Sequence, residues 1–572
     1  MKIVTIKEKE CQAPEACDYI CAQVCPRVRE GALGTVYKRE NKKAAIDENL
    51  CIACGICVNR CPYDAIRVIN LPDELNKELV FQYGINSFRT YNIVSPVEGK
   101  VIGILGRNGI GKTTNINLIS NTLKPNFGDL LKGADEKEIV RRFRGKEIQP
   151  YLEKLYSGSI KISKKEQSLS FAGKVRDVVK KNRYNLIPDE TMERDISSLS
   201  GGQTQLVAIS ATLDDDADVY IFDEPMNYLD IYQRLRIASI IKEKLKDKTT
   251  IIVEHDLVML DYLTDFVQIM YGSESNYGIV SHLMQTRAGI NNYLEGYLPS
   301  ENMKFRDYEI KIKGNVPDGS LEPLVSWPSF NAKVGQFVLS ADQSTVYRGE
   351  IVGIIGENGL GKTTFAKAIT GLVETDNGRL DLGIKVSYKP QFIEAYDAIV
   401  NDMLTAIRSD FLSNEAFSGI MKKLGIDRVL NKNIKNLSGG ELQKLAVFST
   451  LMRDADIYLF DEPSANLDLE DRLETINIIG SFIKVNKKAA IVIDHDLMLI
   501  NAVSTRVALF DGIPNRSGYI KSISRTDDAI NGLLKKVNIT MRKDPDSGRP
   551  RINSPNSRLD IEQKKSGKLF ET

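Results

Sequence analysis

The sequence has 572 residues, and its 77 basic and 76 acidic side chains leave a formal net charge of +1. This length predicts about three to four domains, and the balanced charge provides no global field that would draw the protein to nucleic acid. No stretch approaches the roughly 18 consecutive apolar residues of a membrane-spanning helix, and the start, MKIVTIKEKEC, lacks a signal-peptide pattern. We therefore expect a cytoplasmic protein whose clustered cysteines hold metal rather than disulfides.

All eight cysteines lie in the first 61 residues. The second run has the spacing C-x2-C-x2-C-x3-C-P, which is typical of bacterial ferredoxins, in which the fourth cysteine of a run ligates the neighbouring cluster. The first run is more loosely spaced and also ends in Cys-Pro. This crossover predicts two [4Fe–4S] clusters. The expected ligand sets are Cys51, Cys54, Cys57 and Cys25 for one cluster, and Cys11, Cys17, Cys21 and Cys61 for the other.

A pair of zinc sites is the alternative interpretation, because sets of four cysteines also bind zinc. Three thiols at successive x2 gaps suit a cubane cluster better. The apolar stretches Ile3–Ile6, Ala44–Ile46 and Ile66–Ile69 are candidate strands beside the cysteine loops. They predict a small ferredoxin-like α+β domain that ends near Leu71-Pro72.

Two phosphate-binding loops follow the cysteine region. The β-rich runs Val101–Leu105 and Ile351–Ile355 each lead into the pattern G-x4-G-K-[ST]. In a strand–loop–helix context this pattern predicts a Walker A loop, whose main-chain N–H groups, lysine and hydroxyl hold phosphates and Mg²⁺. The predicted phosphate-binding residues are Gly106, Asn108, Gly109, Gly111, Lys112, Thr113 and Thr114, and in the second copy Gly356, Asn358, Gly359, Gly361, Lys362, Thr363 and Thr364.

Each loop is followed by the same further motifs. The first copy has LSGGQ at 199–203, VYIFDEP at 219–225 and EHD at 254–256, and the second has LSGGE at 437–441, IYLFDEP at 457–463 and DHD at 494–496. The distance from the serine of LSGG to the glutamate of DEP is 24 residues in both copies. We infer an internal duplication of a whole domain.

This set of motifs resembles the ABC ATPase family in both halves. The resemblance implies a head-to-tail pair of domains with two ATP molecules between them, each Walker A loop facing the LSGG motif of the other half. A Ser-Gly-Gly helix start suits this role because it offers N–H donors and a positive dipole end to a γ-phosphate. The signature residues are Ser200, Gly201, Gly202, Ser438, Gly439 and Gly440.

The resemblance also implies the catalytic groups. An aspartate orients Mg²⁺ or its water, a glutamate polarises the attacking water, and a histidine contacts the γ-phosphate. The corresponding pairs, one residue from each half, are Asp223 and Asp461, Glu224 and Glu462, and His255 and His495. Gln391 in K-P-Q and Gln167 in K-E-Q are expected to sense the metal. Asp494 departs from the family pattern, in which a glutamate usually precedes the histidine.

Adenine needs an aromatic platform. Tyr83 and Phe88 precede the first loop, and Trp327 and Phe337 precede the second. Core packing is the alternative role for each of the four. The single tryptophan, in S-W-P, is the preferred adenine stacker of the second half.

A tandem ABC pair behind a two-cluster iron–sulfur domain resembles the ABC-E family of ribosome-recycling ATPases, also called RNase L inhibitor, over nearly the whole chain. The fold class is then α/β, with two tandem ABC-type P-loop nucleotide-binding domains preceded by an α+β ferredoxin-like domain. The expected boundaries are 1–72 for the iron–sulfur domain, 73–305 for the first nucleotide-binding domain with a helix–loop–helix insertion near 133–156 and a hinge near 274–305, 306–530 for the second, and 531–572 for a C-terminal hinge segment.

The resemblance implies an ATPase that splits ribosomes after termination or rescue and stays on the small subunit, with ATP-driven closure moving the iron–sulfur domain. The implied cofactors are ATP, Mg²⁺ and two [4Fe–4S] clusters. The implied partners are the ribosome, especially the rRNA and proteins of its small subunit, and a class-one release factor or Pelota, with initiation factors as further candidates. No membrane contact is expected, and the chain is expected to be a monomer with paired domains.

Basic residues of the insertion and of the tail are candidates for salt-sensitive contacts with RNA. They are Lys137, Arg141, Arg142, Arg144 and Lys146, and Arg542, Lys543, Arg549, Arg551, Lys564 and Lys565. An ordinary solvated charged face is the alternative.

Two other function classes remain open. An ATP-gated electron carrier would use the two clusters as an electron route, but no flavin or other redox site is evident in the sequence. A non-catalytic binding scaffold is opposed by the complete Walker B and switch residues in both halves.

Overall fold

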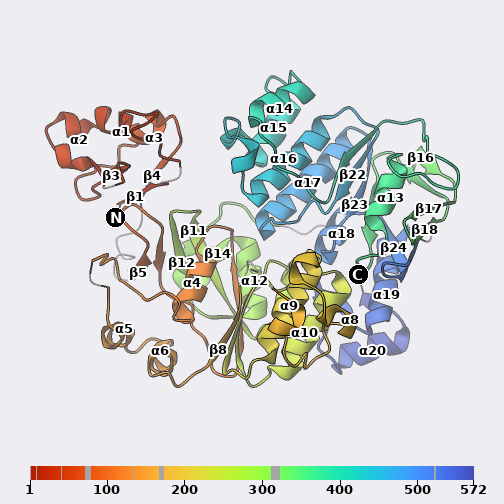
Figure 1. Cartoon of the computed structure of the whole chain (residues 1–572), viewed down its shortest axis with the longest axis horizontal. Coiled ribbons are helices and arrows are strands. Elements are labelled where there is room, and N and C mark those ends of the chain that lie inside the picture. Colours follow the sequence, from red (N-terminus) through yellow and green to blue (C-terminus); the bar gives the residue numbers. More distant parts are fainter. Residues whose placement is uncertain are drawn as a thin grey trace.

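The computed structural model forms an N-terminal domain, two similar lobes and a C-terminal segment (Figure 1). It describes residues 2–7, 10–39, 41–70, 79–131, 133–166, 173–310, 322–520 and 523–571. The expected end of the iron–sulfur domain at Leu71-Pro72 lies outside these residues.

The N-terminal domain is built from two short antiparallel strand pairs, β1 with β4 and β2 with β3, and three short helices. Its elements are β1 (Lys2–Ile6), α1 (Ile20–Gln23), α2 (Pro26–Arg29), β2 (Val36–Lys38), β3 (Ala44–Ile46), α3 (Ile56–Arg60) and β4 (Ile66–Asn70). The three apolar stretches expected to be strands are β1, β3 and β4, so that prediction is confirmed.

The first lobe is a nine-stranded sheet of order β5-β6-β12-β11-β7-β10-β9-β8, with β13 paired to β11. Its strands are β5 (Leu79–Gln82), β6 (Arg89–Tyr91), β7 (Val101–Gly106), β8 (Ile162–Lys165), β9 (Val219–Asp223), β10 (Thr249–Val253), β11 (Phe266–Ser273), β12 (Tyr277–Val280) and β13 (Met284–Gln285). Its helices are α4 (Lys112–Ile119), α5 (Glu136–Arg142), α6 (Gln149–Tyr156), α7 (Val175–Val178), α8 (Asp189–Met192), α9 (Gly201–Asp214), α10 (Ile231–Lys244), α11 (Leu257–Leu263) and α12 (Thr286–Glu295). A small pair, β14 (Tyr297–Leu298) and β15 (Met303–Lys304), follows.

The second lobe repeats this strand order as β17-β18-β25-β24-β20-β23-β22-β21, with β26 paired to β24. Its strands are β16 (Pro323–Trp327), β17 (Phe330–Val334), β18 (Phe337–Ala341), β19 (Ser344–Tyr347), β20 (Ile351–Ile355), β21 (Val386–Lys389), β22 (Ile457–Asp461), β23 (Ala489–Ile493), β24 (Arg506–Ile513), β25 (Ser517–Ile520) and β26 (Ser524–Arg525). Its helices are α13 (Lys362–Ile369), α14 (Val400–Ile407), α15 (Glu415–Lys423), α16 (Gly439–Met452), α17 (Leu469–Val485), α18 (Leu497–Val503) and α19 (Thr526–Val537). The identical order confirms the duplication.

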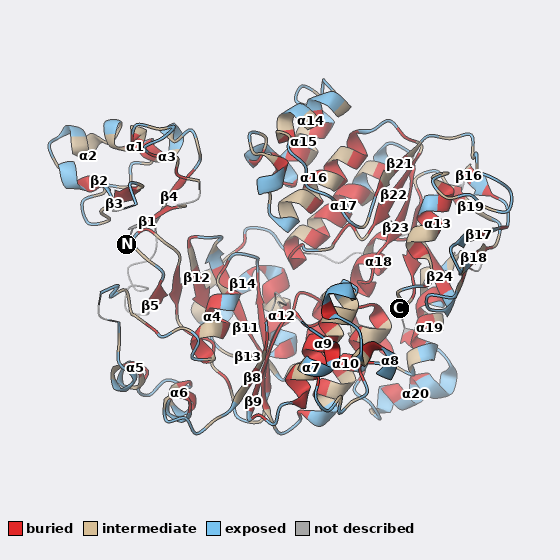
Figure 2. Cartoon of the chain, viewed as in Figure 1, coloured by how far each residue is buried: buried red, intermediate tan, exposed pale blue. Residues whose placement is uncertain are grey.

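The strands that carry the site motifs lie in the centre of each sheet. Every residue of β7, β9 and β10, and of β20, β22 and β23, is buried, and Figure 2 shows β22 and β23 in red. The pairing is parallel, which fits these near-continuous apolar runs. The site residues at the strand ends therefore rest on a rigid core.

The N-terminal domain is anchored to the first lobe by Asn86. This side chain is 1% exposed, and its amide nitrogen donates to the carbonyls of Val4 (3.0 Å) and Ile46 (2.9 Å). Its carbonyl oxygen accepts from the N–H of Ile46 at 2.8 Å. A partly buried Arg89–Glu48 ion pair lies beside it. Because the buried amide is fully used, we expect the domain to move together with the first lobe.

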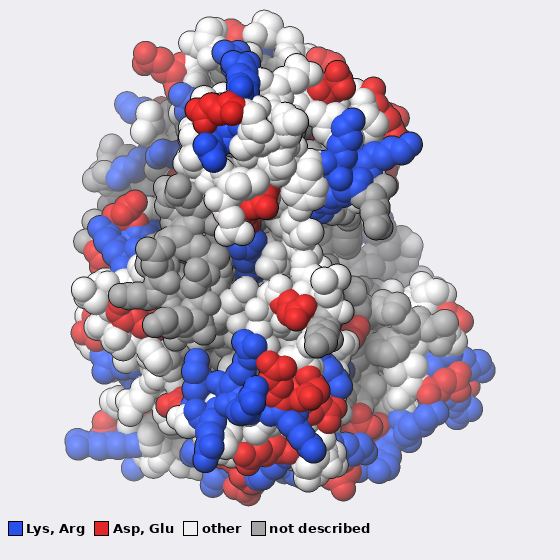
Figure 3. All heavy atoms as spheres, turned by 90° about the vertical axis from the view of Figure 1, so that its left-hand side faces the viewer, with Lys and Arg blue, Asp and Glu red and all other residues white. Residues whose placement is uncertain are grey.

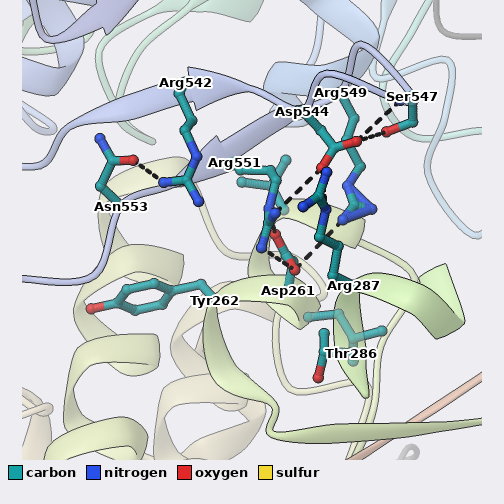
Figure 4. Close-up of polar contacts among 12 residues, drawn as sticks. Asp261, Tyr262, Thr286, Arg287, Arg542, Asp544, Ser547, Arg549, Arg551 and Asn553 are labelled. Atoms are coloured by element: carbon teal, nitrogen blue, oxygen red, sulfur yellow. Dashed lines mark hydrogen bonds and ion pairs between the residues drawn. The ribbon is translucent and has the colours of Figure 1, made fainter. Parts of the chain in front are cut away.

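The C-terminal segment packs against the first lobe through a cluster of arginines and aspartates (Figure 4). The segment consists of β27 (Met541–Lys543), β28 (Pro550–Ile552), α20 (Arg558–Ser566) and β29 (Phe570–Glu571). Arg551 donates to Asp261 of α11 (3.2 Å) and to Asp544 (3.3 Å), and Arg549 is fully buried with its guanidinium 3.6 Å from Asp261. The prediction that Arg549 and Arg551 face RNA is therefore wrong, since both are occupied between domains.

Candidate functional site

Both Walker A loops have the predicted strand–loop–helix geometry. Helices α4 and α13 begin at Lys112 and Lys362, and the preceding glycines have φ of 94° and 88°, in the left-handed region. A Cβ on Gly111 would lie 2.4 Å from the ring of Phe88, and one on Gly361 would lie 2.6 Å from the ring of Phe337. Only glycine therefore fits at this point of either loop.

The lysine and the threonine of each Walker A loop make equivalent hydrogen bonds in the two lobes. The Lys112 ammonium donates to the carbonyls of Gly106 (2.8 Å) and Arg107 (2.9 Å), and Lys362 makes the equivalent contacts at 2.9 and 2.7 Å. The Thr113 hydroxyl donates to the Asp223 carboxylate at 3.3 Å. In the second lobe, Thr363 donates to Asp461 at 2.7 Å. Each Walker B aspartate is thus held beside its phosphate-binding loop.

The glutamate after each Walker B aspartate faces the switch histidine. His255 Nε2 lies 3.5 Å from Glu224 Oε1, and His495 Nε2 lies 3.2 Å from Glu462 Oε1. Burial and the Lys112 charge lower the pKa of His255, although Glu224 opposes this. Burial acts to raise the pKa of Glu462, but the adjacent His495 side chain leaves that pKa lowered. Glu462 is therefore kept as an anion, as polarising a water molecule requires.

Carboxyl groups of the two Walker B motifs are strongly affected by burial. Burial and the neighbouring Glu224 raise the pKa of Asp223 to about 6, and burial raises the pKa of Asp461. Gln391 donates to Glu462 Oε1 at 2.7 Å, which places it in the second site. Gln167 lies outside the described residues.

Asp494 is accommodated by a second substitution. In the first lobe Glu254 accepts from the main-chain N–H of Met226 at 3.1 Å. In the second lobe the shorter Asp494 instead accepts from the hydroxyl of Ser464, the residue equivalent to Met226, at 2.6 Å. The hydroxyl of Ser464 thus extends toward the shorter Asp494 and makes the contact that Glu254 makes with the main chain.

Two aspartates that sequence reasoning missed connect the lobes. The main-chain N–H of Asn108 in the first Walker A loop donates to Asp468 Oδ2 at 3.0 Å, and that of Asn358 donates to Asp230 Oδ2 at 2.9 Å. Each aspartate also caps the helix that follows it, α17 or α10. Both stand six residues after the glutamate that follows the Walker B aspartate, and this repeated spacing is the signal that could have revealed them.

The signature serines cap their helices, with Ser200 and Ser438 forming capping boxes with Gln203 and Glu441. Among the described residues, the hydrogen bonds and ion pairs from a Walker A loop to the opposite lobe go to the segment around Asp468 or Asp230 and to the helix that follows, not to LSGG. The lobes are thus paired head to tail.

One loop position differs in charge between the two sites. The Arg107 guanidinium lies within 3.9 Å of three carboxylates across the interface, those of Asp468, Glu470 and Asp471. Glu357 occupies the equivalent position of the second loop, where burial and the negative charge of Asp230 raise its pKa. The two interfaces are therefore electrostatically unequal.

The aromatic predictions separate into two groups. Phe88 and Phe337 lie against the Walker A glycines as described above, and the Tyr83 hydroxyl is 3.2 Å from the hydroxyl of Thr114. Trp327 is 3% exposed, packs edge-on against Phe365 and donates its indole N–H to a main-chain carbonyl. The prediction that Trp327 stacks on adenine is therefore wrong, because its ring is enclosed in the core.

The cysteines of the N-terminal domain surround two cavities. One cavity is lined by Cys11, Cys17, Cys21 and Cys61, and the other by Cys25, Cys51, Cys54 and Cys57. These are the two sets that the crossover pattern predicts. Burial raises the pKa of Cys21 to about 12 and that of Cys57 to about 11. A positively charged group is needed to keep such thiols ionised, so the donor set fits a cationic metal centre.

The comparisons with known proteins agree with this arrangement. The sequence model of the ABC transporter family matches residues 94–227 and 339–465, and that of the 4Fe-4S binding domain matches residues 44–67. Translation initiation factor RLI1 of Saccharomyces cerevisiae is 38% identical over 100% of this chain and 98% of its own.

Two solved structures are also similar along the chain. The structure of ribosome-bound archaeal Pelota and ABCE1 matches with a TM-score of 0.92 and 39% identity, covering 100% of this chain and 99% of the other. The complex of archaeal ribosomal stalk protein aP1 with the archaeal ribosome recycling factor aABCE1 matches with a TM-score of 0.83 and 39% identity, covering 87% of this chain and 100% of the other.

The fold and the site define an ABC-type ATPase with two nucleotide-binding domains and an N-terminal 4Fe–4S domain. Full-length similarity at this level then places the chain in one branch of that class: it belongs to the ABCE1 family, also named RLI1. None of the described helices is both long and apolar enough to cross a membrane.

Proposed function

We propose that this protein is an ATP-driven ribosome-recycling factor that separates the subunits and stays on the small one. The observation that carries the proposal is that one N-terminal domain touches both ATPase lobes. Asn86 anchors it to the first lobe, and Glu10 lies 3.8 Å from Lys432 of the second. Closure of the lobes would therefore move the N-terminal domain relative to a partner bound to it. The relatives named for ribosome recycling and for binding ribosomes support this use of the motion.

We assign the site residues as follows. Lys112 and Lys362 bind the β- and γ-phosphates, Asp223 and Asp461 with Thr113 and Thr363 would hold Mg²⁺, and Glu224 and Glu462 polarise the water that His255 and His495 help to place. Phe88 and Phe337 contact adenine, with Tyr83 beside the first site. On closure, Ser438 and Gly440 complete the first site, and Ser200 and Gly202 complete the second. The reciprocal contacts of Asp468 and Asp230 support this pairing.

The N-terminal domain would hold two [4Fe–4S] clusters, one in each cysteine cavity. Among the described residues, no three His, Cys, Asp or Glu side chains converge closely enough to hold a single ion. Four cysteines around each cavity, with three of one set at successive x2 gaps, suit a cubane better than a zinc ion. The clusters supply a rigid covalent staple for a domain whose helices have only four or five residues.

The basic insertion is the candidate contact with ribosomal RNA. Its basic side chains are all exposed: Lys137, Arg141, Arg142, Arg144 and Lys146. Figure 3 looks onto the side of the molecule that carries the N-terminal domain, and Lys and Arg side chains gather low on this face, where α5 and α6 lie in Figure 1. Contacts of this kind give binding that weakens as salt rises.

Sedimentation with purified small ribosomal subunits tests the proposal. The double variant Glu224→Gln, Glu462→Gln binds ATP without cleaving it, so we expect it to co-sediment with the small subunit in ATP, and the wild type to do so only with a non-hydrolysable analogue. ATPase activity of the double variant should fall at least about a hundredfold. A double variant that hydrolyses ATP normally contradicts the residue roles, and one that is inactive yet never co-sediments contradicts the ribosomal function.

A further inference from the structure

A buried lysine ends the strand that precedes the glutamine motif in each lobe. Lys165 is the last residue of β8 and is 2% exposed, and Lys389 is the last residue of β21 and is 0% exposed. In both strands half-buried and buried residues alternate, and each lysine lies on the buried face, two residues after a buried serine. Lysine is almost never fully buried unless its charge is compensated, so the occurrence in both copies calls for a reason.

Each ammonium group holds the main chain of the Walker B motif. Lys165 Nζ donates to the carbonyls of Asp223 (2.7 Å) and Glu224 (3.3 Å). Lys389 Nζ donates to the carbonyls of Asp461 (2.7 Å) and Glu462 (3.0 Å). One charged donor therefore bridges the two residues whose side chains face Mg²⁺ and the water molecule in each proposed site.

The main chain at this point is strained. Glu224 and Glu462 both have φ of 49°, in the left-handed region that non-glycine residues rarely adopt. Such a conformation persists only where the surroundings impose it. The carbonyl of each glutamate also accepts from a signature-helix glutamine, Gln205 at 2.8 Å or Gln443 at 2.6 Å. The lysine and the glutamine thus fix the strained peptide from two elements.

Lys112 and Lys362 donate to carbonyls of their own Walker A loops, whereas Lys165 and Lys389 donate to main-chain carbonyls of the Walker B motifs.

We propose that Lys165 and Lys389 are positioning residues for ATP hydrolysis, which hold the left-handed glutamate so that its carboxylate meets the histidine and the attacking water. This inference rests on the role proposed above for the glutamates but not on the ribosomal function. It predicts that the lysines affect the hydrolytic step rather than nucleotide binding.

The test uses the full-length protein with Lys165→Met and Lys389→Met, singly and together, because methionine keeps the length and apolar stem but removes the charge and the donors. We expect the kcat of the double variant to fall at least about tenfold, while KM for ATP stays within about threefold. Lys385→Met is the matched control, since Lys385 lies four residues earlier and pairs with Asp454 at the surface. It should leave kcat unchanged.

A double-mutant cycle separates positioning from a merely structural role. In the Glu224→Gln, Glu462→Gln background the lysine substitutions should cause no further loss of rate, because they act through the glutamates. A kcat within about twofold of wild type, a further loss in that background, or a parallel collapse of kcat, nucleotide affinity and melting temperature would each overturn the proposal. If the double lysine variant does not fold, Lys389→Met alone decides by the same criteria.

Normal hydrolysis by the Glu224→Gln, Glu462→Gln protein itself would instead show that the glutamate roles are wrong. That result is distinguishable from failure of the lysine proposal, which leaves those variants inactive.

Discussion

The ammonium group of Lys432 lies 3.8 Å from the carboxylate of Glu10 and 3.2 Å from that of Glu441. Glu10 belongs to the N-terminal domain, and Glu441 accepts from the N–H of Ser438 in the capping box of the second signature helix. One lysine therefore connects the iron–sulfur domain to the LSGG motif that is proposed to close the first ATP site.

We predict that Lys432→Glu releases the N-terminal domain from the second lobe, because the new carboxylate repels both glutamates. Hydrogen exchange measured by mass spectrometry should become faster in the segments around Glu10 and Lys432. The groups are partly exposed, so the melting temperature should change little, with a cost below about 1 kcal/mol. Lys435→Glu is the control, since Lys435 pairs with Asp397 of its own lobe. Equal exchange in the two variants would contradict the contact.

The two aromatic residues of the second lobe should respond differently to removal. Trp327→Ala should lower the free energy of unfolding by about 3–5 kcal/mol, since it empties a core position. Phe337→Ala should instead weaken binding of a fluorescent ATP analogue about two- to tenfold, because it removes a ring worth about 0.5–1.5 kcal/mol beside Gly361. Thermal denaturation and nucleotide titration measure both effects. The reverse pattern would restore Trp327 as the adenine platform.

Asp496 should make stability depend on pH. It is 1% exposed at the interface of the lobes, where burial and the like charges of Asp256 and Asp494 raise its pKa to about 7, against the attraction of Arg472 and Arg234. A raised native pKa means that the folded state binds the proton more tightly. The stabilisation is complete below the unfolded pKa of about 4 and is lost as pH rises through about 7.

The variant Asp496→Asn removes this titration and keeps a good helix cap. Relative to wild type, it should gain stability between pH 5 and pH 8 (approximate limits set by the two pKa values), measured by urea unfolding at both ends. Asp307→Asn, at a fully exposed site, should show no such gain. A pH-independent difference between Asp496→Asn and wild type would exclude Asp496 as the titrating group.

The arginine cluster at the C-terminal segment predicts opposite effects for two substitutions. None of the three Arg549 guanidinium nitrogens forms a hydrogen bond, so Arg549→Met should be neutral or stabilising. Asp261→Asn should cost about 3–5 kcal/mol, because it leaves the buried Arg549 charge without its nearest carboxylate and removes one of the two carboxylates that Arg551 contacts. Melting temperature and protease sensitivity of the C-terminal segment measure both. A strongly destabilised Arg549→Met would show that the buried charge is compensated by a group not considered above.

The motifs predicted the fold because each joins a buried strand to a loop whose residue types permit only a few backbone conformations. A Walker A loop needs an apolar strand before it and a helix after it, so the positions of β7 and α4 followed from the residues alone. The crossover cysteine spacing likewise predicted which sulfurs share a cavity.

Residues whose role depends on the partner element could not be predicted in the same way. Trp327 and Phe337 both precede the loop, and only the register of β16 and β18 decides which ring points into the core. The sequence suggested that Arg549 and Arg551 lie on a basic surface, because Asp261, which lies beside both guanidinium groups, is far away in sequence. Lys165 was overlooked because a lysine in a strand suggests a solvent-facing position, although its recurrence at Lys389 was visible.

The difference in charge between Arg107 and Glu357, at equivalent positions of the two loops, has a consequence for separation of the lobes. Arg107 attracts the carboxylates of the opposite lobe, whereas Glu357 faces the like charge of Asp230. Separating the lobes at Glu357 relieves this repulsion, whereas separating them at Arg107 breaks ion pairs, so we expect the two interfaces to open with unequal ease. A single side chain in each loop thereby makes two otherwise duplicated interfaces unequal.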